Sequence, residues 1–426
     1  MGADCQYRHG RTPELTQMRI LQLVEAAGAG VGRHGIDLTE GLLCKGHDVH
    51  LLYSPVRADG VFSADVLRLR SRLGLHVHEI PMRRGPSVAD GFAIRELRRY
   101  LRLHGPFDLI HCHSTKAGFL GRLGLIGVPA KRLYTPHMFF TMLSRNFVVR
   151  RLGAALECGL SNGCDGIIAV SREEYQHALD LGISSAKLSL VPNGVRLPNT
   201  DTAQIDRIAA RRQCGLLDDE TCIGFVGRLA PQKSPETMLR SFAALRHLVQ
   251  QRVRLVMIGD GPLAAELRAL AIDLGIEPFV TWLGQRDAKP LMCAFDIFAL
   301  TSDSEGHPIV VLEAMSRGLP IVATAVGGVA DTVQPGVNGF IVPVRGVREI
   351  ADAIAVLVQN PDLRTRMGEA SRRLVQAFSI DRMVDQTVRL YEEVVARKTG
   401  AAAIPPKTPN DLPNGLIVER TRDVRG

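Results

Sequence analysis

The stretch "DIFALTSDSEGHPIVVLEAMSRGLPIVAT", residues 296–324, contains a short apolar run, a polar turn, a helical segment and a second apolar run. Residues 296–302 and 320–324 predict strands, because short apolar runs between turn residues are typical of buried strands. Pro308 suits the first position of the helix between them, and Gly318 suits its end. A strand–helix–strand unit of this kind predicts a parallel sheet.

This alternation runs along the chain and restarts once, after a Pro-Asn-Gly turn within 187–198. Before the turn, strands are expected at 19–25, 48–54, 75–81, 107–112, 132–136 and 165–171, with helices at 34–46, 88–104 and 172–181. After it, strands are expected at 221–227, 254–260, 279–284, 296–302, 320–324 and 339–343, with a long helix at 379–398. We therefore predict an α/β fold of two doubly wound Rossmann-like domains, residues 19–195 and 196–379, that face a cleft.

Both ends of the chain are polar and lack this alternation. Residues 1–18 are predicted to be a disordered leader, with Met1 or Met18 as the start of translation, and residues 399–426 a disordered, proline-rich tail. The leader has no hydrophobic core, so no secretory signal is predicted. No apolar run reaches the roughly 18 residues that span a bilayer. The eight cysteines form no Cys-x-x-Cys pair, which favours a reduced, cytoplasmic protein without structural zinc.

Excess positive charge is confined to the first half of the chain. Residues 1–198 contain 25 Lys and Arg against 17 Asp and Glu, whereas residues 199–426 contain 27 of each, so the net charge of +8 lies entirely in the first half. Such a surface suits an anionic membrane or another anionic partner, or it is simply a solvated face. Nucleic acid is not predicted as a partner, because aromatic residues are only 5% and do not alternate with basic ones.

Two strand-to-helix junctions carry groups suited to an anion. In "EAAGAGVGRHG" (25–35), glycines let the backbone approach a ligand, although a plain tight turn explains them equally well. In "GRLAPQKS" (227–234), Arg228 and Lys233 follow a strand end, where they either clamp a diphosphate or remain solvated.

A third junction, in the opening stretch, brackets a predicted anion site with two carboxylates. The first amides of its helix, at Ile309, Val310 and Val311, are expected to face the cleft and bind phosphate oxygens. Glu305 precedes the helix, and Glu313 lies about 7–8 Å along its axis at about 1.5 Å per residue. Carboxylates near phosphate repel it unless they bind something else, and the hydroxyls of a ribose and a second sugar would serve. The pair therefore suits a nucleotide sugar, with two solvated glutamates as the alternative.

Together these stretches resemble the retaining GT-B glycosyltransferases of family 4 (group 1). "SDSEGHPIVVLEAMSRGLPIVAT" is similar to their E-x7-E signature and "GRLAPQKS" to their G-R-x-x-x-x-K phosphate loop, while "IGDGPL" (258–263) and "VPNGV" (191–195) match two further markers. "GVGRHGIDLTEGLLCKGHDVHLLYSP" and "HCHSTKAGFLGRL" resemble the branch that builds bacterial exopolysaccharide and other surface glycans. The resemblance covers residues 19–397 and implies that helix 380–397 packs back onto the first domain. The first glycine turn departs from the paired glycines common in relatives.

The resemblance implies roles for residues around the donor sugar and the acceptor. Glu313 would hold the ribose hydroxyls. Glu305 would contact hydroxyls of the transferred sugar, helped by the backbone of Gly306 and His307. In the first domain, His113 would reach the sugar or the reaction centre. His137 is implied as an acceptor-side candidate, whereas the neighbouring histidine at 111 is expected to be satisfied structurally.

The leaving group would be handled by cations and backbone. Arg228 and Lys233 would neutralise the departing diphosphate, and the backbone at Gly30 and Gly32 would close over it. Charge stabilisation of this kind is usually the largest catalytic contribution. The chain has no Asp-x-Asp, and its own cations make a metal unnecessary, so neither a metal nor another cofactor is expected. The family implies retention through attack by the acceptor on the leaving-group face.

We therefore predict a retaining hexosyltransferase that uses a nucleoside-diphosphate sugar, with uridine as the base and guanosine as the second choice. Its acceptor would be a glycan or a polyprenyl-linked glycan in surface polysaccharide synthesis. A non-transferring nucleotide-sugar 2-epimerase and a non-catalytic scaffold share the architecture, but epimerases lack the paired motifs and a scaffold would have lost cleft residues. The donor sugar, the acceptor, the linkage and the oligomeric state stay open.

The segment "RNFVVRR" (145–151) predicts where the acceptor lies, because it mixes apolar residues with arginines. Exposed, it would insert apolar groups at a headgroup boundary while its cations meet anionic lipid. The first domain would then dock on the inner face of the cell membrane. The alternative is that the apolar residues pack inside and the arginines solvate a helix.

Overall fold

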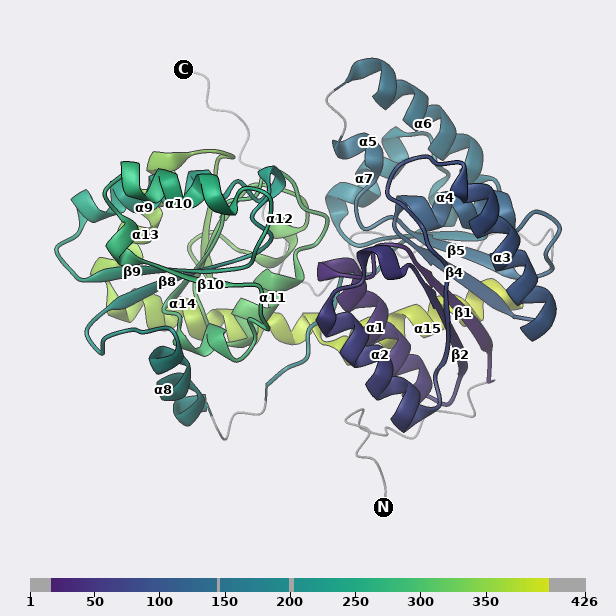
Figure 1. Cartoon of the computed structure of the whole chain (residues 1–426), viewed down its shortest axis with the longest axis horizontal. Coiled ribbons are helices and arrows are strands. Elements are labelled where there is room, and N and C mark those ends of the chain that lie inside the picture. Colours follow the sequence, from purple (N-terminus) through teal and green to yellow (C-terminus); the bar gives the residue numbers. More distant parts are fainter. Residues whose placement is uncertain (1–16, 144–145, 199–202, 398–426) are drawn as a thin grey trace.

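The computed structural model describes residues 17–143, 146–198 and 203–397. Two parallel sheets form the centres of two domains that lie next to each other (Figure 1). The first sheet has the order β3-β2-β1-β4-β5-β6-β7, and the second has the order β10-β9-β8-β11-β12-β13. In each, the order reverses beside the first strand of the domain, which is the pattern of a doubly wound fold. The predicted fold class is therefore confirmed.

The first domain contains these elements: β1 (Arg19–Val24), α1 (Ala29–Cys44), β2 (Asp48–Tyr53), α2 (Gly60–Leu73), β3 (His76–Glu79), α3 (Ala89–His104), β4 (Leu109–His113), α4 (Thr115–Gly124), β5 (Lys131–Thr135), α5 (Phe140–Leu143), α6 (Phe147–Ser161), β6 (Gly166–Ala169), α7 (Arg172–Asp180) and β7 (Leu188–Leu190). Its central strands β1, β4 and β6 are buried almost throughout, because helices cover both faces of the sheet.

The second domain contains these elements: α8 (Ala203–Gln213), β8 (Thr221–Val226), α9 (Pro235–Leu248), β9 (Val253–Ile258), α10 (Ala264–Asp273), β10 (Val280–Gly284), β11 (Ile297–Leu300), α11 (Ile309–Ser316), β12 (Ile321–Thr324), α12 (Val329–Thr332), β13 (Gly339–Val342), α13 (Val347–Gln359) and α14 (Pro361–Leu374). The last helix, α15 (Ile380–Ala396), returns to the first domain.

The return of α15 depends on close packing against α1. Val384 and Tyr391 of α15 are fully buried within the hydrophobic core of the first domain. A Cβ at Gly41 of α1 would lie 2.4 Å from a methyl carbon of Val384, so only glycine lets the two helices approach this closely. The Tyr391 hydroxyl also accepts a hydrogen bond from the Gln22 side chain at 3.0 Å. The chain thus crosses between the domains a second time after α14.

Two predicted boundaries are wrong in ways that affect the site. Helix α1 begins at Ala29, five residues before the predicted start at 34, so Gly30 and Gly32 lie inside its first turn and not in a loop. Its N-cap is Gly28, whose extended backbone needs no side chain to begin the helix. Strand β4 continues to His113, so this histidine is the last strand residue.

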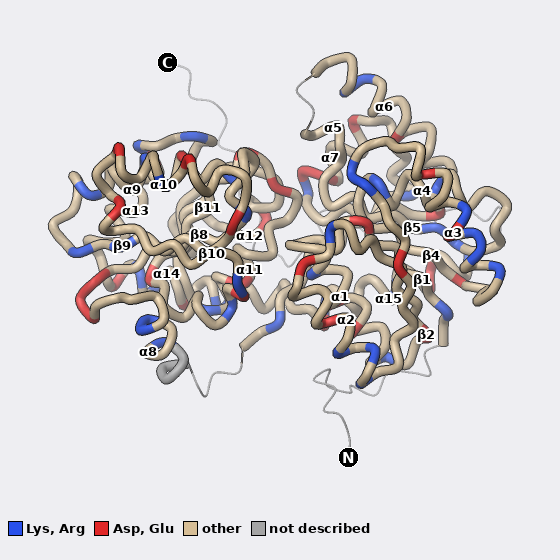
Figure 2. Tube along the Cα trace, in the orientation of Figure 1, with Lys and Arg blue, Asp and Glu red and all other residues tan. Residues whose placement is uncertain are grey.

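Several other expectations concern the surface and the chain ends. The predicted leader and tail lie almost entirely outside the described residues. Within the described ranges, no helix is long and apolar enough to cross a membrane. Lys and Arg positions gather along α3 in the first domain (Figure 2). Six described cysteines are free thiols.

Candidate active site

The carboxyl edges of the two sheets meet, and the residues of the predicted site lie at this junction. The Asn193 amide donates to the His307 carbonyl at 2.8 Å, which joins the linker to the turn before α11. A Cβ at Gly306 would lie 2.7 Å from the carbonyl oxygen of His137, so the backbones of the two domains touch there. Because ligands of doubly wound domains bind at carboxyl edges of strands, this junction is the candidate active site.

Glu305 and Lys233 form a buried ion pair on the second-domain wall. The Lys233 ammonium donates to Oε1 of Glu305 at 2.5 Å, and the Ser302 hydroxyl donates to the same oxygen at 2.5 Å. Glu305 is only 8% exposed. Both bonds are on Oε1, so the carboxylate is fixed in orientation.

The loop that carries Lys233 is bonded to the turn that carries Glu305. The Asp303 amide donates to the Gln232 carbonyl at 2.8 Å, and the Gln232 side chain donates to the Ser304 carbonyl at 3.1 Å. The Lys233 side chain also runs beside Gly227, whose added Cβ would lie 3.4 Å from it. Two segments about seventy residues apart in sequence thus form one rigid surface.

A glycine pair that the sequence reasoning missed supports this surface from behind. Gly327 has φ +50°, and a Cβ there would lie 2.0 Å from the Glu305 carbonyl oxygen. The Gly328 amide donates to the Gly306 carbonyl at 2.6 Å. Only glycine allows such an approach. The signal was present in the sequence, because a Gly-Gly pair lies in the loop between strand β12 and helix α12.

The start of α11 differs from the expectation in two details. Pro308 has ψ 105° and is the N-cap, so the helix begins one residue later than predicted. The Val311 amide donates to the Pro308 carbonyl at 3.0 Å. Its proposed role as a phosphate donor is therefore wrong, since that amide is already bonded. Ile309 and Val310 precede this first bond of the helix and are the two amides suited to an anion.

Glu313 is enclosed by cations from both domains. Its Oε1 lies 3.9 Å from the ammonium of Lys289. Burial raises the pKa of the Glu313 carboxyl, and the positive charges of Lys289 and Arg33 oppose that shift. Arg33 belongs to α1 and pairs with Asp37 at 2.9 Å, so charge on the first domain reaches the second-domain carboxylate. Sequence reasoning missed Lys289 and Arg33, because neither lies in the motif of its partner.

Three predicted donor-site residues, Arg228, Gly30 and Gly32, differ in their exposure and packing. Arg228 is exposed at the carboxyl end of β8. Gly30 is also exposed, and an added Cβ there would meet nothing within 4 Å. Gly32 is buried, and its added Cβ would lie 2.8 Å from the Ala27 carbonyl carbon and 3.1 Å from Phe62. Gly32 is thus needed for packing of α1, whereas Gly30 keeps an open backbone.

The first-domain wall consists of buried histidines. His113 is fully buried, with Nε2 2.6 Å from the Gln22 side-chain oxygen and Nδ1 3.2 Å from Nε2 of His137. Burial lowers the pKa of His113 and of His137 well below the ordinary value. His111 is bonded on both ring nitrogens, to Tyr391 at 2.6 Å and to Thr135 at 2.7 Å, as expected for a structural residue.

His307 contributes a further buried imidazole from the second domain. It is 4% exposed, and neither ring nitrogen has a hydrogen-bond partner among the described residues. Burial lowers its pKa to about 3, so the ring is neutral at pH 7. Its carbonyl is bonded to Asn193. The carbonyl of His307 is therefore already used in joining the domains.

Two family models match the chain in tandem. Residues 28–197 match the family described as "Glycosyltransferase Family 4", and residues 206–374 match "Glycosyl transferases group 1". A D-inositol 3-phosphate glycosyltransferase of Kribbella flavida is 32% identical over 340 residues, which are 74% of this chain and 78% of that protein. The chain belongs to the family 4, group 1 glycosyltransferases.

Two further matches place this glycosyltransferase among its relatives. An Escherichia coli UDP-Gal:alpha-D-GlcNAc-diphosphoundecaprenol alpha-1,3-galactosyltransferase is 28% identical over 301 residues, covering 68% of this chain and 77% of that protein. The crystal structure of Anabaena HepE in complex with UDP and glucose covers 88% of this chain and 100% of its own, with a TM-score of 0.75 at 21% identity. The latter likeness shows the GT-B fold. Membership in the family argues against the non-transferring epimerase.

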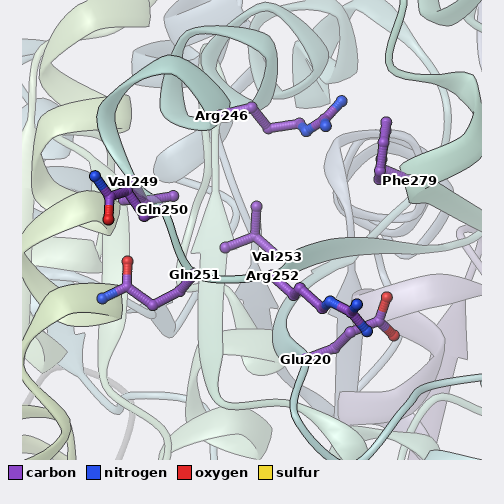
Figure 3. A pocket seen from close by; sticks show the side chains of 8 residues that line it. All are labelled: Glu220, Arg246, Val249, Gln250, Gln251, Arg252, Val253 and Phe279. Carbon is purple, nitrogen blue, oxygen red and sulfur yellow. The ribbon is translucent and has the colours of Figure 1, made fainter.

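A pocket elsewhere in the glycosyltransferase is separate from this site. It is lined by Glu220, Arg246, Phe279 and residues 249–253 (Figure 3). These residues precede or begin strands β8, β9 and β10, so the pocket lies at the amino edge of the second sheet. Arg246 covers the Phe279 ring at 3.2 Å from its centroid. Ligands of this fold bind at the opposite edge, and the donor site is therefore not here.

Proposed function

We propose that this glycosyltransferase moves a hexosyl unit, with retention and without a metal, from a UDP-sugar to a lipid-linked or other glycan of the bacterial surface. The observation that carries the proposal is the Lys233–Glu305 pair, a cation and a carboxylate fixed on one surface beside the start of α11. In this proposal Lys233 stabilises the departing diphosphate, and Glu305 holds the sugar that moves. UDP in HepE and the UDP-Gal donor of the Escherichia coli relative favour uridine over guanosine.

Metal independence is supported by how the carboxylates are used. Asp303 and Glu305 are the nearest approach to an Asp-x-Asp motif, and each is paired with a cation: Arg345 with Asp303, and Lys233 with Glu305. Two carboxylates that are already neutralised make a poor pair of ligands for Mg²⁺. The chain's own cations supply the charge that a metal would bring to the diphosphate.

Turnover with separated donors tests the chemistry. Purified protein is incubated with UDP-glucose, UDP-galactose, UDP-N-acetylglucosamine and GDP-mannose, each with a polyprenyl-diphosphate-linked sugar, and released nucleotide and product anomer are measured. We expect release of UDP and an α-linked product from an α-linked donor. Turnover only with the guanosine donor, or an inverted product, would contradict the proposal.

The acceptor side carries a surface suited to a membrane. Helix α6 exposes Phe147 (59%), Val148 (62%), Leu152 (67%) and Leu156 (50%), so the alternative that its apolar residues pack inside does not hold. Figure 1 shows α6 at the outer end of the first domain. Residues 148, 152 and 156 are spaced by four and share one face of the helix.

The charge of α6 complements anionic lipid. Arg150 and Arg151 are exposed, and both lie over the Phe147 ring, at 6.0 and 5.5 Å. The helix has a single acidic residue, Glu157, which is buried and paired with Arg122 at 2.7 Å. Its exposed surface is therefore apolar and basic, which suits a bilayer interface with anionic headgroups. We propose peripheral docking there, on the inner face of the cell membrane.

Vesicle flotation tests the docking step. We expect the protein to float with vesicles that contain phosphatidylglycerol and not with pure phosphatidylcholine. The double variant Phe147→Ser/Leu152→Ser should lose flotation, while Leu103→Ser, which changes a leucine of similar exposure on α3, should keep it. Equal and negligible binding to both vesicle types at low salt would leave a soluble acceptor as the conclusion.

A further inference from the structure

Three histidines that are far apart in the sequence converge on the first-domain wall of the cleft. They are His34 of α1, His113 at the end of β4, and His137 after β5. One ring nitrogen from each lies within 4.8 Å of the others. The ring centroids of His34 and His137 are 4.6 Å apart, with the planes nearly perpendicular at 73°. Such a cluster offers three nitrogen ligands from three elements of a rigid domain.

The outer hydrogen bonds of His113 prepare it as a ligand. The Gln22 amide nitrogen donates to the Tyr391 hydroxyl, so the Gln22 oxygen accepts from Nε2–H of His113 at 2.6 Å. This bond places the proton on Nε2, so the lone pair of Nδ1 accepts a hydrogen bond from Nε2–H of His137, and a bound ion would take the place of that proton. Metal-binding histidines are generally oriented in this way by a partner on the other nitrogen.

The spacing and burial of the cluster also fit a metal ion. Nδ1 of His113 and Nε2 of His137 are 3.2 Å apart, close to the roughly 3.3 Å between ligands of a tetrahedral ion with bonds of about 2.0–2.1 Å. His34 is 4% exposed, and its Nδ1 is buried with no partner among the described residues.

We propose that His34, His113 and His137 form a binding site for a divalent cation that prefers nitrogen ligands, with Zn²⁺ as the best fit. Three neutral imidazoles with a fourth position open suit Zn²⁺, Co²⁺ or Ni²⁺ and not Mg²⁺. The site is on the opposite wall from the diphosphate cations, so it has no part in activating the leaving group. A bound ion would occupy the Nδ1 of His113 and would therefore inhibit transfer.

Cobalt binding tests the site without any need for turnover, so its failure would leave the proposed transfer untouched. Chelator-treated full-length protein is titrated with Co²⁺, and visible absorption is recorded. We expect one equivalent to produce the intense bands of a tetrahedral nitrogen site, and added Zn²⁺ to abolish them. His34→Asn and His137→Asn should each weaken Co²⁺ binding by roughly 100-fold. Loss of an outer partner of a metal ligand weakens binding by about 10- to 100-fold, and loss of a ligand itself should cost at least the upper value.

A second cluster on the same domain provides the matched control. Asp48, His50 and His76 also bring three potential ligand atoms within 4.8 Å, but His50 is already bonded to Tyr100 at 2.7 Å and His76 is exposed. His76→Asn should leave the cobalt spectrum unchanged. Circular dichroism and a thermal melt check that each variant is folded. If His34→Asn does not fold, His137→Asn decides the test, because His137 lies in a half-buried loop. Absence of a saturating spectrum, or a spectrum lost only in His76→Asn, would overturn the proposal.

Discussion

The two walls of the cleft handle polar groups in opposite ways. On the second-domain wall, Glu305 and Glu313 face the ammonium groups of Lys233 and Lys289, so each negative carboxylate lies beside a positive charge. On the first-domain wall, His113 and its neighbours are neutral imidazoles whose protonation is suppressed by burial. A nucleotide sugar has the same division, since its diphosphate is charged and its sugar is not. For the proposed donor we therefore expect binding that is electrostatic on one wall and based on neutral hydrogen bonding on the other.

Removing Glu305 should produce the largest effect, because this carboxylate is fixed where the transferred sugar is proposed to lie. We expect Glu305→Ala to lower kcat by about 1,000-fold, of the order found when a fixed group that acts on the transition state is lost. UDP affinity should change little. The matched control is Glu369→Ala, which removes an exposed carboxylate of α14. Steady-state kinetics with UDP release measures both variants, and a change confined to KM would contradict the assignment.

Glu313 should affect binding more than turnover. A ribose contact is the same in the ground state and the transition state, so its loss is a loss of uniform binding. We expect Glu313→Ala to weaken UDP binding by roughly 10- to 100-fold, as for one or two hydrogen bonds to a charged group, with kcat changed far less. Isothermal titration calorimetry with UDP and GDP gives the dissociation constants. Wild-type affinity for both nucleotides would show that the ribose is held elsewhere.

The buried neutral histidines of both domains predict sensitivity to acid. Burial lowers the pKa of His34 to about 4 and of His307 to about 3, below the ordinary value of 6.5. Because the unfolded chain binds these protons more readily, their contribution to stability is complete above pH 6.5 and is lost as the pH falls toward those values. Between pH 7.5 and 5, each should contribute a loss of about 2 kcal/mol in the free energy of unfolding.

Urea unfolding at several pH values measures that loss. His307→Phe keeps an aromatic ring beside Phe378, whose centroid is 5.6 Å away, and removes the titrating group. Its unfolding free energy should therefore fall less between pH 7.5 and 5 than that of the wild-type protein. His247→Phe, which changes a histidine in the last turn of α9, serves as the control and should retain the wild-type dependence. An identical dependence for His307→Phe and wild type would show that His307 does not contribute to the acid sensitivity.

Chelation should have the smallest effect on catalysis. The diphosphate is expected to meet the protein's own cations, so kcat with excess EDTA should equal kcat without it. A loss of activity that magnesium restores would show that the charged wall is incomplete without a metal. If trace zinc occupies the histidine site, EDTA should instead raise activity, and this rise should be absent in His34→Asn.

Much of the charged wall could be predicted from the sequence, because its residues lie in short segments between strand and helix. Glu305 and Lys233 lie in the loops that follow β11 and β8, and Glu313 lies in the helix that follows β11, at the edge where the doubly wound fold places ligands. The details that failed involve backbone geometry. The extended conformation of Pro308 and the early start of α1 at Ala29 shift which amides are available, and periodicity does not resolve boundaries at that level.

Alternating apolar runs and helical segments by themselves determined the two parallel sheets, since only burial on both faces of a sheet accounts for such runs. The sequence also showed which of these predicted strands are followed by charged residues. Only the tertiary structure decided that His34 joins His113 and His137, and that Arg33 reaches Glu313 across the cleft. These residues lie on separate elements, and the distance between elements depends on how helices and domains pack, which local periodicity does not encode.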